Sequence, residues 1–258
     1  MIDSEGRAFA PRSVLVADDR LYREILQGSD SVGLLEDLDA MVIPYSGRAE
    51  VNEREVATVR EILLDTAQLI PGALLVKNPY EANSYEFAEL AIETFASAKY
   101  HALANVARLL GAREVRFVEA KADRSAAAWR ADAKASAPAG GGEVEITNEV
   151  TKKLEARLEG QMKFPGADPV PGDALAYLQR RNLSNDYQLK ELVEMRTGTN
   201  LISDYKMTLS GTRESAANLR SALKIANAGP VKAVDIGVSF SKTAESISSI
   251  EITTEIVF

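Results

Sequence analysis

The chain has 258 residues, of which 46% are hydrophobic and 26% charged, with one His, no Cys and a net charge of −8. A chain of this length can bury a conventional hydrophobic core, while the absence of Cys excludes disulfides, thiolate metal sites and a Cys nucleophile. The acidic balance disfavours general attraction to phosphate backbones or anionic lipid, so no nucleic acid partner is expected.

The N-terminal segment, MIDSEGRAFAPRSVLVADD, has neither the basic start nor the long apolar stretch of a signal peptide. No window approaches the roughly 18 to 20 apolar residues of a transmembrane helix. We therefore expect a cytoplasmic protein.

Charge is distributed unevenly along the chain, with a net charge of −6 over residues 1–80 and −2 over residues 81–258. We predict a small acidic α/β unit over residues 1–80. For residues 81–258 we predict a long linking helix, then a larger antiparallel sheet of long amphipathic strands with helices packed on it. The fold class is therefore α+β, and the sequence leaves open whether the two regions form one continuous fold.

Short apolar runs alternate with helical patterns in the first region. Three runs predict buried strands, at residues 13–17, 40–43 and 73–76. Helical spacing predicts helices over residues 21–27 and 52–70, the second beginning at a capping box formed by Asn52 and Glu55. This order of elements predicts parallel strands joined by helices.

Two acidic residues, Asp18 and Asp19, follow the first predicted strand in the sequence VLVADD. Over these few residues the chain resembles the metal-binding acids of response-regulator receiver domains, which implies a divalent cation at this position. The chain departs from that family because Asp39 precedes its strand, and because the region is too short for five strand and helix units. The alternative role is helix capping, since negative charge near a helix N-terminus is favourable.

The strongest helical pattern covers residues 83–109, where Asn83 and Glu86 form a capping box and one face stays apolar until Gly111. The only histidine, His101, lies beside this apolar face. A lone His can act as a general base, so His101 is a candidate catalytic residue. The competing interpretation is a boundary residue with one hydrogen bond satisfied.

Alternation of apolar and polar residues predicts amphipathic strands in the second region. Strands are expected over residues 115–122, with a slip in phase, and over residues 129–135. A loop is expected at residues 137–142, after the second of these strands.

The longest alternation covers residues 144–164, with apolar residues on one parity and polar residues on the other. A helix competes for its middle, because Val150, Leu154 and Leu158 are spaced by four. The flanking runs EVEIT and GQMKF favour a bent or broken strand.

The remaining pattern predicts an αα-hairpin over residues 174–195, a strand over residues 201–209 and a helix over residues 216–226. Alternation over residues 231–258 then predicts a C-terminal β-hairpin.

The chain lacks the motifs that mark common catalytic and nucleotide sites, including GxSxG, GxxxxGK[ST] and GxGxxG. The first functional expectation is a non-enzymatic module that acts by protein–protein association or self-assembly, as a homo-oligomer or with a partner protein. No cofactor is predicted.

Two alternatives remain open. One is a pore-forming or membrane-inserting effector that uses amphipathic β-hairpins at residues 144–164 and 231–258 and meets a membrane only after a trigger. The other is a carboxylate- or metal-dependent enzyme, for which Asp18 and Asp19 are the candidate metal ligands and, with His101, the candidate catalytic residues.

Overall fold

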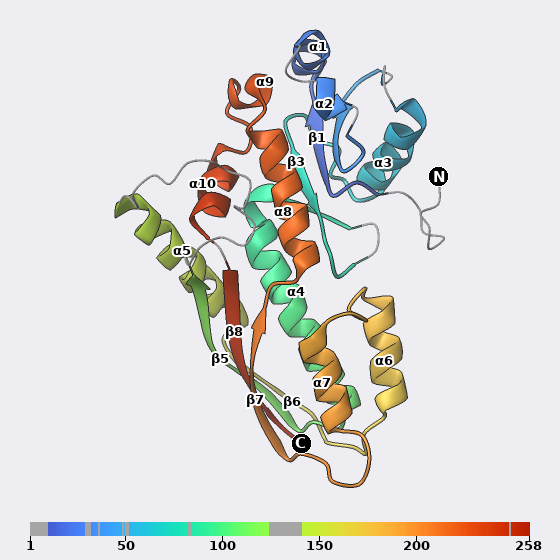
Figure 1. The fold of residues 1–258 in the computed structure, drawn as a ribbon, viewed down its shortest axis with the longest axis vertical. Coiled ribbons are helices and arrows are strands. Elements are labelled where there is room, and N and C mark those ends of the chain that lie inside the picture. Colours follow the sequence, from blue (N-terminus) through green and yellow to red (C-terminus); the bar gives the residue numbers. More distant parts are fainter. Residues whose placement is uncertain are drawn as a thin grey trace. The chain divides into compact units, whose positions relative to one another are not determined.

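The computed structural model describes residues 10–28, 32–35, 37–47, 49, 52–81, 84–123, 141–247 and 249–258. The described residues form a mixed α+β fold, as the sequence predicts, and this fold contains two four-stranded sheets (Figure 1). They divide into two compact units. The first contains the described parts of residues 1–78, 83–92 and 214–245, and the second those of residues 79–82, 93–213 and 246–258.

The sheet of the first unit confirms the three predicted strands and adds a fourth. Its strands lie in the order β2-β1-β3-β4, with bounds β1 (Ser13–Ala17), β2 (Ala40–Pro44), β3 (Leu74–Lys77) and β4 (Tyr85–Phe87). Strands β1 and β2 are parallel, but β3 is antiparallel to β1. The expectation of parallel strands throughout was therefore wrong, because an apolar run predicts a buried strand without specifying its direction.

Helices cover both faces of this sheet. Helix α3 (Glu53–Asp65) packs Val56, Val59 and Leu63 against side chains of β1, β2 and β3. On the opposite face, α8 (Arg213–Ala226) is held by hydrogen bonds, with Ser221 Oγ lying 2.7 Å from Ser13 Oγ and Asn218 Nδ2 donating to the Lys77 carbonyl at 2.8 Å. Shorter helices complete the unit: α1 (Asp19–Gln27), α2 (Val32–Leu35), α9 (Gly229–Lys232) and most of α10 (Val238–Ser246).

The sheet of the second unit is antiparallel, with strands in the order β6-β5-β8-β7. Its strands are β5 (Glu114–Asp123), β6 (Gln161–Lys163), β7 (Asp204–Ser210) and β8 (Ser249–Val257). The predicted slip in phase is confirmed by an irregularity between Phe117 and Glu119 of β5. The helices are α4 (Ala88–Leu109), which begins in the first unit, α5 (Gly141–Leu158) and the predicted hairpin of α6 (Pro171–Arg180) and α7 (Tyr187–Met195).

The two faces of this second sheet differ in polarity. One face carries apolar side chains, and there the Phe117 ring meets the Tyr100 ring of α4 edge to face at 6.4 Å. The other face carries a cross-strand row of charges, in which Glu255 of β8 pairs with Arg116 of β5 and with Lys206 of β7. The strands are therefore amphipathic, as predicted from their alternation.

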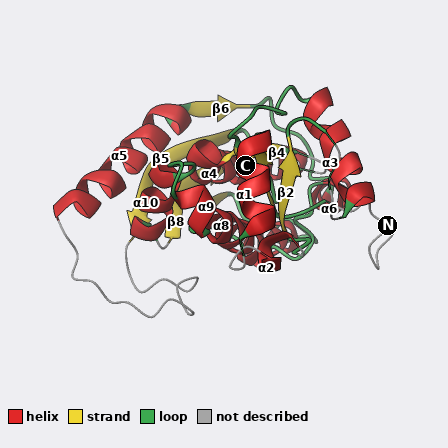
Figure 2. Cartoon of the chain, turned by 90° about the horizontal axis from the view of Figure 1, so that it is seen from above, coloured by secondary structure: helices red, strands yellow, loops and turns green. Residues whose placement is uncertain are grey.

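The predicted strand over residues 144–164 is wrong for most of its length. The chain forms helix α5 instead, which lies beside β5 (Figure 2), and only Gln161–Lys163 is a strand. The spacing of four predicts this helix correctly, because Val150, Leu154 and Leu158 are buried on one face of α5. The predicted strand at residues 129–135 and most of the predicted loop at residues 137–142 lie outside the described residues, and residues 141 and 142 belong to α5.

The predicted C-terminal hairpin is also wrong in its first half. Residues 229–232 and 238–246 are helical, and Pro230 begins a helix in addition to ending the preceding one. Phe240, Ala244 and Ile247 are buried at spacings of four and three, which fits a helix better than a strand. The second half is the predicted strand, β8, which lies between β5 and β7.

A buried ion pair joins three elements of the second unit. Lys99 Nζ of α4 lies 2.7 Å from Asp186 Oδ2, and the two side chains are only 5% and 4% exposed. The same Nζ donates to Gln188 Oε1 at 3.3 Å and to the Ser210 carbonyl at 2.6 Å. Asp186 also caps α7, where its Oδ1 accepts from the Leu189 amide at 3.2 Å. The pair therefore fixes α4, α7 and β7 together.

Lys99→Met is expected to lower the free energy of unfolding by about 3 kcal/mol, because it leaves the Asp186 carboxylate buried without its counter-ion. The double variant Lys99→Met/Asp186→Asn should recover part of this loss, since Asn can keep the cap without a charge. Urea unfolding measures both, with the exposed change Lys190→Met as control. A loss as small as that of the control would contradict the assignment.

Thr254→Val is expected to raise the free energy of unfolding by about 1 kcal/mol. Thr254 is fully buried, and its hydroxyl has no hydrogen-bond partner among the described residues. Thermal unfolding compares it with Thr253→Val, whose hydroxyl lies 3.3 Å from the Thr208 hydroxyl on the other face. We expect no stabilisation from the Thr253 change, and equal effects of the two would refute this explanation.

Candidate functional site

Asp18 and Asp19 lie at the N-terminus of α1 in the first unit. Asp18 Oδ1 accepts hydrogen bonds from the amides of Arg20 at 2.9 Å and Leu21 at 2.8 Å, so the capping role of Asp18 is confirmed. Asp19 Oδ1 accepts a hydrogen bond from Ser46 Oγ. In the part of the chain that the structure describes, no three His, Asp or Glu side chains converge as a metal site would require.

His101 is exposed on α4 in the second unit, with its ring 5.7 Å from that of Tyr100. Partial desolvation lowers the pKa of the imidazole, and the positive charge of Arg157 on α5 lowers it further. The structure places His101 in a different unit from Asp18 and Asp19. A catalytic role for any of the three stays a prediction.

A buried carboxyl group, Glu93, lies on α4 and interacts electrostatically with charged side chains of α5. Desolvation raises the pKa of this group, Lys153 and Arg157 act in the opposite direction, and Glu149 raises it. Arg157 Nη1 also lies 3.4 Å from Thr94 Oγ1, which ties the two helices together. We therefore expect the stability of the second unit to depend on pH through Glu93.

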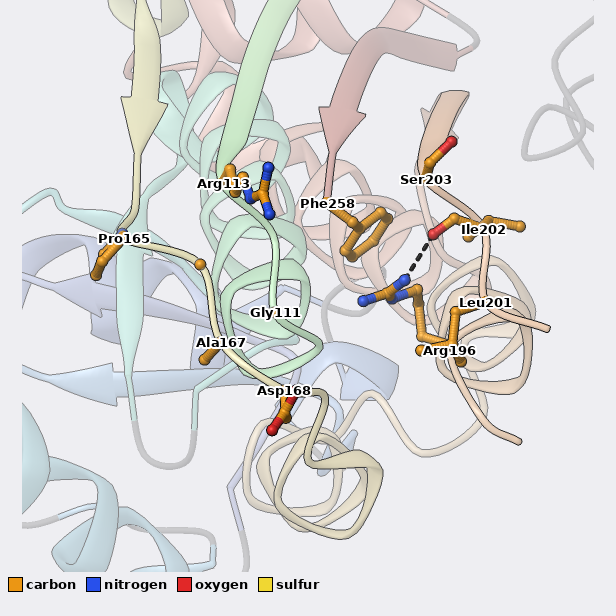
Figure 3. Close-up of a pocket in the computed structure, with 11 residues that line it drawn as sticks. Gly111, Arg113, Pro165, Ala167, Asp168, Arg196, Leu201, Ile202, Ser203 and Phe258 are labelled. Carbon is orange, nitrogen blue, oxygen red and sulfur yellow. Dashed lines mark hydrogen bonds between the residues drawn. The ribbon is translucent and has the colours of Figure 1, made fainter. Parts of the chain in front are cut away.

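A pocket of about 610 Å³ in the described residues has three charged side chains in its lining (Figure 3). It lies at one end of the second sheet. Five segments of the second unit line it, and their lining residues are Gly111, Arg113, Pro165, Gly166, Ala167, Asp168, Arg196, Leu201, Ile202, Ser203 and Phe258.

Arg196 forms one wall of the pocket and is only 8% exposed. Its Nε donates to the Leu110 carbonyl at 3.1 Å and its Nη1 to the Ile202 carbonyl at 2.6 Å. The guanidinium also lies over the Phe258 ring, 4.2 Å from its centre. These contacts hold the guanidinium plane in one orientation.

Two further charged residues, Arg113 and Asp168, are exposed at the pocket and carry opposite charges. Neither side chain makes an ion pair or hydrogen bond with the residues that the structure describes. Figure 3 shows Arg113 and Asp168 on different segments of the wall. Both charges are therefore available to a bound group.

The pocket depends on the turn between α4 and β5. Gly111 has a φ of +88°, and a Cβ placed there would lie 2.1 Å from the Ala167 carbonyl oxygen, so a larger residue would displace the segment that carries Ala167. Backbone hydrogen bonds fix the same segment at both ends, from Phe164 to Arg113 at 2.8 Å and from Val170 to Leu109 at 2.9 Å.

Comparison of the chain with protein-family models, with curated proteins and with solved structures found no match. Among the described residues, no helix is both long and apolar enough to cross a bilayer.

The pocket offers guanidinium donors, one side-chain carboxylate and apolar side chains to a bound group.

Glu93→Gln is expected to stabilise the protein at neutral pH and to have little effect well below pH 4.5, the ordinary value for this carboxyl. The raised pKa means that the folded state is favoured while Glu93 is protonated and loses this advantage as the pH rises through the folded-state pKa. Urea unfolding across pH measures the difference, with the exposed change Glu155→Gln as control. If the difference in free energy of unfolding between Glu93→Gln and the unchanged chain is the same at every pH, the raised pKa of Glu93 is contradicted.

Proposed function

We propose that this protein is a non-enzymatic module that acts by association with another protein chain, and that it holds a segment of that chain in the pocket lined by Arg113, Asp168 and Arg196. The partner is either a different protein or a second copy. The observation that supports the proposal is the presence of charged groups of both signs in one pocket, unused by the described residues.

The energetics favour recognition at this pocket. Polar groups that already have partners must give them up on binding, whereas Arg113 and Asp168 exchange only water. Arg196 is immobilised before binding, so its side-chain entropy is not lost again. The apolar side chains of Leu201, Ile202 and Phe258 add surface that a bound segment can cover.

Strand addition at the β7 edge of the second sheet is less well supported. The outer edge of β7 is occupied near its end by the side-chain amide of Gln188, whose Nε2 donates to the Thr208 carbonyl and whose Oε1 accepts from the Ser210 amide at 3.2 Å. Lys206 lies further along the same strand, and an edge lysine discourages pairing with another strand. The pocket is thus the better candidate for association.

The other two functional classes have less support. The membrane-inserting proposal assumed β-hairpins at residues 144–164 and 231–258. The first segment is mostly helix α5, and the second has helices in its first half and only one long strand, β8, in its second half. The metal-dependent proposal needs free carboxylates at Asp18 and Asp19, and one oxygen of each accepts a hydrogen bond within the chain.

Arg113→Gln is expected to weaken association at least about tenfold, because a charge-assisted hydrogen bond contributes about 1.5 to 3 kcal/mol. The fold should be unaffected, since Arg113 is exposed and its side chain has no described partner. The matched control is Arg220→Gln, which removes the same charge from an exposed position on α8.

Two measurements test this prediction. Sedimentation velocity over a roughly hundredfold concentration range detects self-association. Capture of other proteins on the immobilised chain detects a different partner. The amount captured is compared between the unchanged chain, Arg113→Gln and Arg220→Gln. A chain that stays monomeric and binds no protein in a manner dependent on Arg113 would contradict the proposal.

A further inference from the structure

Arg196 is a buried cation without a counter-ion among the described residues. No Asp or Glu of the described residues lies within ion-pair distance of it, and desolvation alone lowers the pKa of the guanidinium. Buried charges in folded proteins are normally paired, because an isolated buried charge is costly. The carbonyl oxygens of Leu110 and Ile202 compensate this cost in part, but they carry no net charge.

The unused donor of Arg196 is Nη2. The other two nitrogens donate to carbonyl groups, and no hydrogen bond from Nη2 to the described residues occurs. The Cβ position of Gly111 lies 3.5 Å from Nη2 and 2.1 Å from the Ala167 carbonyl oxygen, so Nη2 lies close to the backbone segment that carries Ala167.

A second guanidinium approaches the same stretch of backbone. The Arg113 side chain lies across Gly166, with Cγ 3.0 Å and Nε 3.2 Å from the Cβ position of that glycine. The next residue, Ala167, places its carbonyl oxygen against Gly111, beside Arg196 Nη2. Neighbouring Cα atoms are about 3.8 Å apart, so the two arginines flank one short segment.

We propose that Arg113 and Arg196 form a carboxylate-binding site, in which an acidic side chain of a bound peptide segment accepts hydrogen bonds from the free fork of Arg113 and from Nη2 of Arg196. The site's existence is independent of the proposed function, but the source of the carboxylate, a partner protein, rests on it.

The donor set suits a carboxylate better than a phosphate dianion. One free guanidinium fork matches the two oxygens of a carboxylate, and Arg196 adds the N–H donors of one further nitrogen, Nη2. Asp168 also lines the pocket and would repel a dianion more strongly than a monoanion. Asp168 can in addition accept a hydrogen bond from a backbone amide of a peptide, which supports a peptide segment as the ligand.

The test uses the full chain labelled with ¹⁵N and follows the arginine Nε–Hε resonances by NMR. The probes are glutamate blocked at both ends, blocked glutamine as the neutral control, and inorganic phosphate. We expect blocked glutamate to shift the Arg113 and Arg196 resonances in a saturable manner, and blocked glutamine to leave them unchanged. Arg113→Gln should weaken the binding at least about tenfold, and Arg220→Gln should not.

The outcomes separate the two proposals. No saturable shift with blocked glutamate, or the same shift in Arg113→Gln, would overturn the carboxylate site. Tighter binding of phosphate than of blocked glutamate would overturn the choice of carboxylate. If phosphate binds Asp168→Asn more tightly than it binds the unchanged chain, this would support the proposal that Asp168 repels a dianion. If blocked glutamate binds but association with a partner does not depend on Arg113, the site stands and the proposed function fails.

Discussion

The second unit depends on one buried cation, Lys99, and on the acceptors gathered around it. The acceptors come from two parts of the chain: Asp186 and Gln188 at the start of α7, and the Ser210 carbonyl at the end of β7. Gln188 in turn bonds the edge of β7, so the position of α7 and the protection of that edge have a common origin. Because α7 ends just before Arg196, the same arrangement places one wall of the pocket.

The sequence predicts the strands of the first unit well, but not the direction of β3 or the helices α9 and α10, and it predicts the elements of the second unit only in part. Apolar runs such as Ser13–Ala17 are long enough to identify buried strands. Residues 144–164 mislead because their alternation coincides with a spacing of four at Val150, Leu154 and Leu158, and two-residue and four-residue periods agree at every fourth position. The choice between strand and helix depends on how these residues pack against β5, and the sequence of residues 144–164 alone does not contain that information.

The pocket could be predicted only in fragments. Gly111 and the Pro165-Gly166 pair are visible in the sequence as places where elements end. Nothing in the sequence shows that these two turns pack on each other, or that Arg113 and Arg196 lie on either side of the segment with Gly166 and Ala167. The residues are far apart in the chain and belong to no motif. Asp18 and Asp19 are, in contrast, adjacent in the sequence and so are easily recognised there as a candidate metal site. The structure shows that Asp18 caps α1.

Both units are assembled from segments that are distant in the chain, and this has a consequence for how the protein is made. The first unit needs α8 to cover one face of its sheet, and β5 of the second unit needs β8 as its long neighbour. A ribosome releases β1 and β5 long before it releases α8 and β8. Until then β1 has one face uncovered and β5 has an edge unpaired, and such non-local pairing folds slowly. Nascent chains of this protein are expected to need protection from aggregation during synthesis.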